Sequence, residues 1–522
     1  MNSKRAFSIG LLVPGMVLLV AALACQQGAP DAPPPWNASQ YTSPFPTTIP
    51  TANIFAPLTS RDPGQPFVSP TPDSPHAVPH IRTEALDYTI QAGDTLGQVA
   101  RAYGISLEEL IAANESINPN WLSIGQVIHV PPPKPDSRGP SFKIVPDSEL
   151  VYGPASALFD AADFVKKQNG YLTRYQQENI EDLGGATLSG AQIVQQVAQQ
   201  YSVNPRLLLA VLEYQSGWVS QPADPPAEAL AYPIGITEDI RKGLYRQLAW
   251  AANLLNRGYY LWRVNGVGSW VLADGTVVPV DATINAGTAG VQQLFAPLYG
   301  RDGWRKAVTG EGVFAAYRRL FGYPFDIAVE PLVPAGIRQP KLQLPFEPGV
   351  IWAFTGGPHG GWGDGSAWAA LDFAPSGEAM GCVASDAWIV AAGSGPVLRA
   401  GNGEVIQDLD GGGMANDGYE QTGWVLLYMH VASRDRVQPG TYLKAGDRIG
   451  HPSCEGGFST GTHLHIARRY NGEWISADQT LPFVLDEWIS RGVGNEYDGF
   501  LVKEDDRIEA WNGISPANSI QR

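Results

Sequence analysis

The sequence predicts a multidomain α+β protein, with a small βααβ unit, a mostly α-helical middle region and an antiparallel all-β C-terminal unit. Its 522 residues exceed the length of about 250–300 residues at which a single core stops growing. A hydrophobic content of 44%, including 10% aromatic residues, excludes a wholly disordered chain. Apolar residues recur at helical spacing up to about residue 325, whereas short β-type runs between glycine clusters follow residue 342.

The charge of the chain narrows the class of partner. The formal net charge is -16, which argues against nucleic acid or another polyanion. We therefore expect an acidic, soluble surface outside the cytoplasm.

Residues 1–25 have the pattern of an export signal. Lys4 and Arg5 precede an apolar stretch at 9–24, which Pro14 interrupts. The stretch ends in Ala22-Leu23-Ala24-Cys25, which resembles a bacterial lipobox with its leucine one place late. The resemblance implies a lipidated Cys25 and a membrane-anchored lipoprotein at the cell envelope. An ordinary signal peptide and an uncleaved anchor are the alternatives, and all three place the chain outside the cytoplasm.

The cysteine count then favours a disulfide. With Cys25 assigned to the lipid, Cys382 and Cys454 are left as a pair in an oxidising compartment. Two free buried thiols are the alternative, because sequence does not give their geometry.

Residues 26–86 form a linker and 87–133 a small folded unit. The linker is rich in Pro, Ser and Thr, which is typical of an extended spacer. The folded unit is predicted as a strand at 88–90, helices at 96–103 and 107–111, and a closing strand at 125–130. Ser106 and Glu109 form a capping box for the second helix.

This unit resembles a LysM module. The similarity lies in the segment from Tyr88 to Leu96, in Asn114 and in Ile124-Gly125-Gln126. It implies binding of N-acetylglucosamine-containing glycans such as peptidoglycan, in a groove between two loops. The implied glycan-binding residues are Gly93, Asp94, Thr95, Leu96, Asn114 and Ile117. A module that has lost affinity and serves as a spacer is the alternative.

Residues 134–186 are predicted as a connector and 187–330 as a helical region. The segment 204–217 resembles the catalytic helix of the lysozyme-like lytic transglycosylases, but Gln215 replaces the glutamate of that family. An amide cannot protonate a glycosidic oxygen. Glu213 lies roughly 200° around the helix and is expected to point away from the same cleft. We therefore expect a degenerate domain that binds glycan or acts as a spacer.

Residues 342–480 carry the metal-ligand pattern, and 481–522 form a tail of undecided structure. The segment Gly461-Thr462-His463-Leu464-His465 places two imidazoles on one face of a strand. With another histidine and an aspartate from elsewhere, such a pair suits a catalytic zinc, which takes three protein ligands and one water.

This region resembles the lysostaphin-type zinc endopeptidases of bacterial cell walls. Gly461 to His465 and Tyr428-Met429-His430 match two motifs, but Trp368 stands where most members have a histidine. His359 lies thirteen positions before Asp372 instead, as in the beta-lytic endopeptidase branch. The resemblance implies His359, Asp372 and His465 as zinc ligands, and His430 and His463 as catalytic histidines.

Together these features predict a membrane-anchored, Zn²⁺-dependent endopeptidase. The implied substrate is the peptide stem or bridge of peptidoglycan, at bonds next to glycine, with the LysM module concentrating the enzyme on glycan. The main rival is a non-catalytic wall-binding scaffold or an activator of wall hydrolases.

Overall fold

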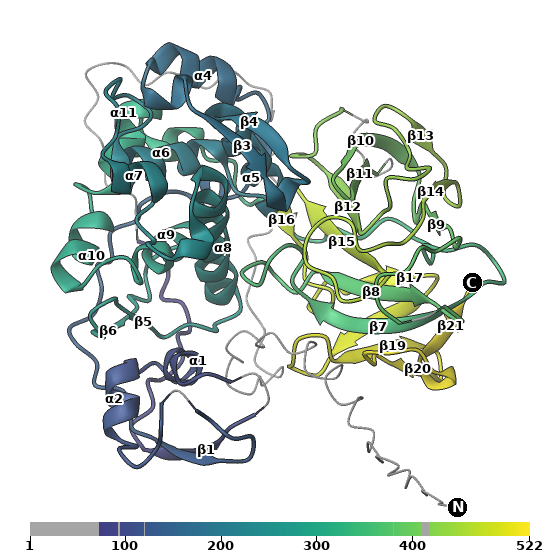
Figure 1. The fold of residues 1–522 in the computed structure, drawn as a ribbon, viewed down its shortest axis with the longest axis horizontal. Helices are drawn as coiled ribbons and strands as arrows, with labels where there is room; N and C mark the ends of the chain where they lie inside the picture. The colour runs from purple at the N-terminus through teal and green to yellow at the C-terminus, as the bar shows by residue number, and fades with distance from the viewer. Residues whose placement is uncertain (1–71, 92–93, 120, 379, 410–416) are drawn as a thin grey trace, which may run out of the picture.

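The computed structural model describes residues 72–91, 94–119, 121–378, 380–409 and 417–522. They form a βααβ unit, a helical unit and a β unit, and the βααβ unit lies at one end of the helical unit (Figure 1). The predicted export signal, Cys25 and Gly93 lie outside the described residues. Among the helices described, none is both long and apolar enough to cross a membrane.

The βααβ order predicted for the first unit is confirmed. Its elements are β1 (Leu86–Thr89), α1 (Leu96–Ala102), α2 (Leu107–Ala112) and β2 (Val127–Val130). The two strands pair antiparallel, and the predicted capping box of Ser106 and Glu109 is present. A second capping box joins Thr95 and Gln98 at the start of α1. The unit has its own small core, which includes Ile90, Val99 and Leu110.

The helical unit begins earlier than residue 187. Ile144 and Leu150 belong to the same apolar core as the long helices, so the predicted connector is largely part of this unit. Its elements are α3 (Asp147–Leu150), α4 (Ala161–Gln168), β3 (Gln176–Ile180), β4 (Ala186–Ser189), α5 (Gly190–Tyr201), α6 (Pro205–Ser216), α7 (Ala227–Ala231), α8 (Leu244–Arg263), β5 (Ser269–Val271), β6 (Val277–Pro279), α9 (Ala286–Phe295), α10 (Arg301–Ala307) and α11 (Val313–Phe321).

The β unit is built on one large antiparallel sheet. Its strand order is β13-β10-β11-β12-β15-β8-β7-β21, and β16 pairs with β15. The strands of this sheet are β7 (Ile351–His359), β8 (Ala370–Pro375), β10 (Gly395–Gly401), β11 (Glu404–Asp408), β12 (Trp424–Met429), β13 (Tyr442–Leu443), β15 (Leu464–Tyr470), β16 (Glu473–Trp474) and β21 (Ser519–Gln521). A separate two-stranded sheet pairs β9 (Ile389–Val390) with β14 (Arg448–Gly450). The antiparallel all-β prediction for this part of the chain is confirmed.

The C-terminal segment is folded as well. It forms a four-stranded sheet in the order β17-β18-β19-β20. These strands are β17 (Val484–Leu485), β18 (Trp488–Gly492), β19 (Gly499–Lys503) and β20 (Asp506–Glu509). Phe483, Leu485 and Leu501 are buried in the apolar core of the β unit, so the tail packs on the large sheet.

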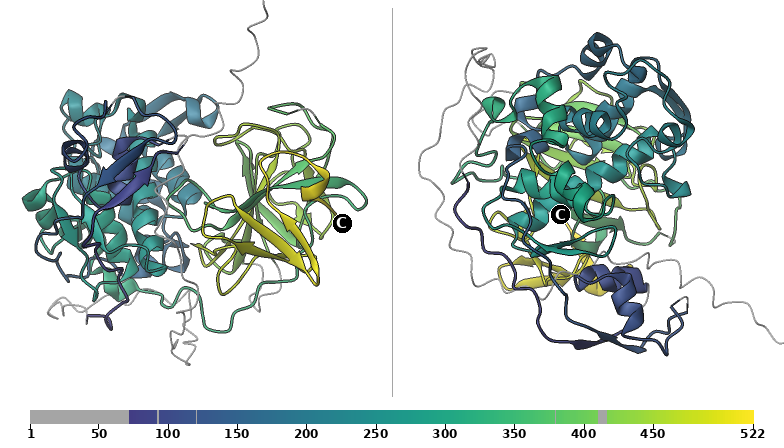
Figure 2. Two further views of the ribbon diagram at one scale, coloured as in Figure 1. Left: turned by 90° about the horizontal axis from the view of Figure 1, so that it is seen from below. Right: turned by 90° about the vertical axis from the view of Figure 1, so that its left-hand side faces the viewer.

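The large sheet has a different core on each face. Along β12, Trp424, Leu426 and Tyr428 belong to the core of the β unit. Val425 and Leu427, on the opposite face, belong to the core of the helical unit. The helical unit therefore covers one face of the sheet. The two units lie side by side in the left view of Figure 2, and in the right view the helical unit lies in front of the β unit.

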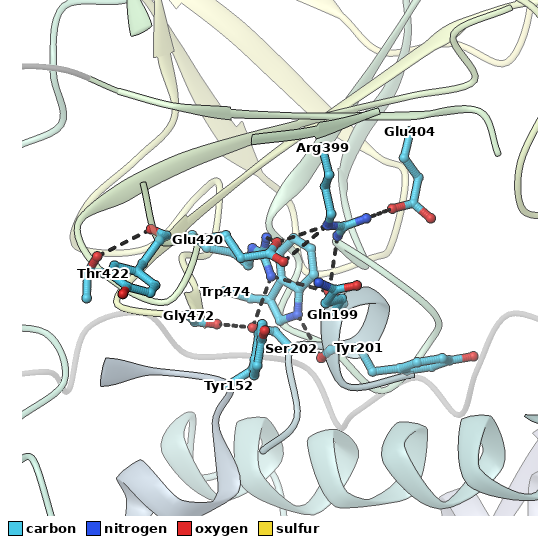
Figure 3. Close-up of polar contacts among 12 residues, drawn as sticks. Tyr152, Gln199, Tyr201, Ser202, Arg399, Glu404, Glu420, Thr422, Gly472 and Trp474 are labelled. Atoms are coloured by element: carbon cyan, nitrogen blue, oxygen red, sulfur yellow. Dashed lines mark hydrogen bonds and ion pairs between the residues drawn. The ribbon is translucent and has the colours of Figure 1, made fainter. Parts of the chain in front are cut away.

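A buried network of charges crosses this interface (Figure 3). Arg399 bonds Glu404 at 2.5 Å and Glu420 at 3.2 Å, and Arg469 bonds Glu420 at 2.8 Å. On the helical side, the hydroxyl of Ser202 lies 3.2 Å from Arg469. The amide of Gln200 donates to Glu404 at 3.0 Å. Two arginines and two glutamates thus balance one another, with the helical unit completing their hydrogen bonds.

We expect Glu420→Ala to destabilise the joined units by about 3–5 kcal/mol, because it removes the partner that the buried Arg469 shares with the partly buried Arg399. Urea unfolding followed by tryptophan fluorescence measures the change. Asp386→Ala is the control, because the Asp386–Arg434 ion pair is exposed and should contribute less than about 1 kcal/mol. Equal effects of the two substitutions would contradict the prediction.

Candidate metal centre

Three strands bring the predicted zinc ligands to one place. His359 ends β7, while Asp372 in β8 pairs directly with His465 in β15. The side chains of Asp372 and His465 lie on the sheet face that the helical unit covers, because Ala370 and Ala467 on the same face belong to its core. The β7–β8 register shifts between Gly356 and His359, which carries the histidine to the aspartate.

The donor atoms fit a tetrahedral zinc. Nε2 of His359 lies 3.0 Å from Nδ1 of His465 and 3.2 Å from Oδ1 of Asp372. Nδ1 of His465 lies 3.2 Å from the same oxygen. Donors at the usual zinc bond length in a tetrahedron lie roughly 3.3 Å apart. Oδ1 of Asp372 is buried without a hydrogen-bond partner, as expected of an atom that binds a cation.

Backbone carbonyls orient both ligand imidazoles. Nδ1 of His359 donates to the carbonyl of Gly357 at 2.8 Å, and Nε2 of His465 donates to that of Gly361 at 3.1 Å. A carbonyl only accepts, so each of these nitrogens carries the proton and the other keeps its lone pair for a metal. This is the outer support that zinc-binding histidines usually have.

The ionisation of the cluster also suits a divalent cation. Burial alone would raise the pKa of Asp372, but the imidazoles of His359 and His463 outweigh burial and hold that pKa well below its ordinary value. Burial lowers the pKa of His465. Burial would also lower the pKa of His359, but the carboxylate of Asp372 raises it overall.

His463 and His430 lie beside the three ligands. Nε2 of His463 is 3.8 Å from Oδ1 of Asp372, and the ring centroids of His430 and His463 are 4.4 Å apart. Their Nδ1 atoms donate to the carbonyls of Glu455 and Gly461, so each Nε2 is left as a proton acceptor. Burial, with the charges of His463 and His465, lowers the pKa of His430 to about 3. The backbone φ of His430 is 63°, a strained value for a non-glycine residue.

The predicted disulfide is present and braces the loops around these histidines. Cys382 is bonded to Cys454, next to the Glu455 carbonyl that orients His430. Thr462, which precedes His463, donates to the carbonyl of Gly381 at 3.0 Å. The bond therefore joins the loop that holds His430 to the chain that leads into the His-x-His segment.

Sequence reasoning missed the C-terminal residues that reach the site. The Tyr497 ring is stacked on that of His359 at 4.3 Å and 20°. The Glu496 carboxylate accepts from the amide of Gly360 at 3.2 Å. Both belong to a short turn in the tail, which carries no metal-ligand motif and joins β7 only through the tertiary fold.

His451, a further histidine of the β unit, is buried and is not one of the three convergent donors. It is 4% exposed, its Nδ1 donates to the carbonyl of Ala387 and its ring packs on Trp388. His451 therefore supports the β unit away from the ligand cluster. The sequence alone does not distinguish a buried histidine from an exposed one in a short β-strand.

The described residues of the predicted glycan site differ in burial and in their contacts. Leu96 is buried in its core. The Asn114 amide is used internally, since it bonds the backbone of Leu110 and His129. Asp94 accepts from the hydroxyl of Tyr88, Thr95 caps α1 and Ile117 is half-buried. Backbone groups of these loops are therefore the main contacts they could offer to a ligand.

The expectation that Glu213 points away from the cleft near Gln215 is wrong. Both residues line one cavity of about 490 Å³ at the end of α6. Gly217 ends the helix in a left-handed conformation and turns residues 219–220 back over it. Glu213 accepts from the amides of Val219 and Ser220 and pairs with Arg319. Its carboxylate is thus fully engaged in holding this loop.

Comparison with known families divides the chain into three matched segments. Residues 88–131 match the LysM domain, residues 143–333 match the family described as "LasA, N-terminal domain", and residues 377–477 match peptidase family M23. The family that matches residues 143–333 is not the lytic transglycosylase family that the segment 204–217 resembles. The match also includes most of the predicted connector at 134–186.

Several individual proteins are similar to parts of this chain. Protease LasA of Pseudomonas aeruginosa is 27% identical over 354 residues, covering 63% of this chain and 74% of that protein. The secreted LysM effector ECP6 of Passalora fulva is 49% identical over 45 residues, covering 8% of this chain and 20% of the effector. Among solved structures, the deep-sea M23 metalloprotease pseudoalterin is 21% identical with a TM-score of 0.28, covering 35% of this chain and 99% of its own. The lysostaphin catalytic domain from Staphylococcus simulans is 25% identical with a TM-score of 0.17, covering 24% and 86%.

Proposed function

We propose that this chain, which carries a LysM domain and an M23 peptidase domain, is a zinc-dependent endopeptidase that hydrolyses peptide bonds of bacterial peptidoglycan. The observation that carries the proposal is the convergence of His359, Asp372 and His465 on one point, with two further histidines beside it. Two neutral imidazoles, one carboxylate and a free fourth position are the donor set of a hydrolytic zinc.

The roles of the residues follow from their geometry. His359, Asp372 and His465 would hold Zn²⁺, which supplies an acidified water and polarises the scissile carbonyl. The free Nε2 of His463 lies close enough to the ligands to take a proton from the attacking water. His430 offers a second free Nε2 for the tetrahedral oxyanion or for returning a proton to the leaving amine.

The LysM domain would bring the enzyme to its substrate. Binding to the glycan strand raises the effective concentration of the peptidase at the peptide cross-links. Within the LysM domain we propose the loops at Gly93 to Leu96 and Asn114 to Ile117 as the glycan-binding surface. The beta-lytic spacing of His359 and Asp372 favours peptide bonds next to glycine.

An extracytoplasmic location fits the proposed substrate. Protease LasA and a secreted LysM effector are among the proteins this chain resembles. We propose that residues 1–25 direct export and that Cys25 carries a lipid anchor at the cell envelope, as the lipobox-like segment implies.

Metal removal tests the proposal directly. We expect one zinc per purified chain by elemental analysis, and release of new amino groups, without new reducing ends, from insoluble peptidoglycan. Treatment with 1,10-phenanthroline should abolish amino-group release and added zinc should restore it. Sedimentation of the chain with peptidoglycan should persist without metal, because the LysM domain makes that contact.

The same experiment distinguishes the proposed endopeptidase from the rival function, a non-catalytic wall-binding scaffold. A chain that binds stoichiometric zinc and sediments with peptidoglycan, yet releases no amino groups from walls of differing cross-link chemistry, would be a wall-binding scaffold. New reducing ends that survive chelation would place the activity in the helical unit instead.

A further inference from the structure

The strand that carries His359 is not held by a regular ladder. Its pairing with β8 is shifted on both sides of Gly356, and Pro358 has no amide proton to donate. A ligand at the end of such a strand needs support from another element, because zinc sites require ligands placed within about 0.5 Å.

The turn at residues 495–498, between β18 and β19, supplies that support. The amide of Gly357 donates to the carbonyl of Tyr497 at 2.7 Å, and the amide of Tyr497 donates to the carbonyl of Pro358 at 3.1 Å. A β-carbon on Gly357 would lie 2.7 Å from the backbone of Asp498, so the two segments are in close contact. The turn therefore runs along β7 just before the ligand.

These hydrogen bonds connect the turn to the residue that orients the imidazole of His359. Gly357, whose amide donates to Tyr497, is also the residue whose carbonyl accepts from Nδ1 of His359. The ring of Tyr497 is stacked on the other side of the same imidazole. Tyr497 itself has a φ of 67°, a backbone conformation that is costly for an aromatic residue unless its surroundings impose it.

Glu496 holds the chain on the far side of the ligand. Its Oε1 accepts from the amide of Gly360, the residue after His359, while its Oε2 is buried without a hydrogen-bond partner. Burial raises the pKa of Glu496, and His359 opposes this effect. The side chain of Glu496 thus reaches from the turn to the residue that directly follows the ligand His359.

We propose that Glu496 and Tyr497 are positioning residues of the metal centre, which lock His359 in its ligand orientation and so determine how tightly the chain retains zinc. The inference rests on the zinc site proposed above. It assigns the C-terminal sheet a part in the metal centre that lies outside the M23-matched residues 377–477.

Zinc affinity, measured by competition with a fluorescent chelator, tests the inference. We expect Glu496→Gln and Tyr497→Ala each to weaken zinc binding about tenfold or more, as loss of outer support for a metal-binding histidine typically does. Tyr497→Phe keeps the stacked ring and should stay within about twofold of wild type. Glu509→Gln, the same substitution at an exposed position of β20, is the matched control.

Thermal unfolding of the metal-free variants separates positioning from folding. A variant whose metal-free midpoint equals that of wild type but whose zinc affinity falls supports the inference. Wild-type affinity in both Glu496→Gln and Tyr497→Ala would overturn it, and so would an equal loss in Tyr497→Phe and Tyr497→Ala. A wild-type chain that binds no zinc would contradict the proposed function first, and this inference with it.

Discussion

His465→Ala is expected to leave the purified chain with far less than one zinc and to lower amino-group release from peptidoglycan by at least about a thousandfold. The substitution removes one of three protein ligands and leaves only His359 and Asp372 to hold the cation. Elemental analysis and an amine assay on the same preparation measure both effects. The two losses should occur together, since without the cation there is no Lewis acid at the scissile bond.

His129→Ala is the control for this experiment. Its imidazole is about half exposed in the βααβ unit and pairs only with the exposed Asp87, so its loss should change neither zinc content nor activity. Full zinc occupancy in His465→Ala would show that the metal, if bound, lies elsewhere. Loss of zinc with normal turnover would contradict a role of this site in catalysis.

His463→Ala should separate metal binding from turnover. Its Nε2 is not among the three convergent donors, so we expect the variant to keep about one zinc per chain. Its rate should fall by about a hundredfold to ten-thousandfold, the usual range for loss of a general acid–base group. The measurement is kcat on soluble cross-linked muropeptides, with zinc content determined in parallel.

His430→Ala in the same assay divides the two roles. Because both histidines present a free Nε2, the variant with the larger loss of kcat identifies the group that takes the proton from water. A His463→Ala variant that also loses zinc would instead make His463 a ligand. Turnover within threefold of wild type in both variants would contradict general acid–base catalysis by this pair.

The metal cluster could be anticipated partly from a local rule and partly from a resemblance. The period of two predicts that His463 and His465 share one face, whereas His359 and Asp372 were implied as ligands by the similarity to the beta-lytic endopeptidase branch. Histidine and aspartate side chains at these positions can be brought together in few other ways than around one metal ion. The βααβ unit was predictable from local rules, since its caps and periodic apolar residues lie close together in sequence.

What could not be anticipated depends on contacts between distant segments. Glu496 reaches Gly360 across 136 positions, and no pattern in the tail distinguishes it from other surface carboxylates. His451 is buried only because Trp388 packs on it. Glu213 enters the cavity near Gln215 because the left-handed Gly217 folds the chain back, which a helical wheel does not represent.

The interface between the helical and β units has a consequence for limited proteolysis. The segment at 334–341 that joins them contains no helix or strand. Val425 and Leu427 nevertheless belong to the core of the helical unit, and the Arg399–Glu420–Arg469 network is completed from that side. A chain nicked in this segment should therefore elute from gel filtration as one particle and separate into two fragments only in denaturant.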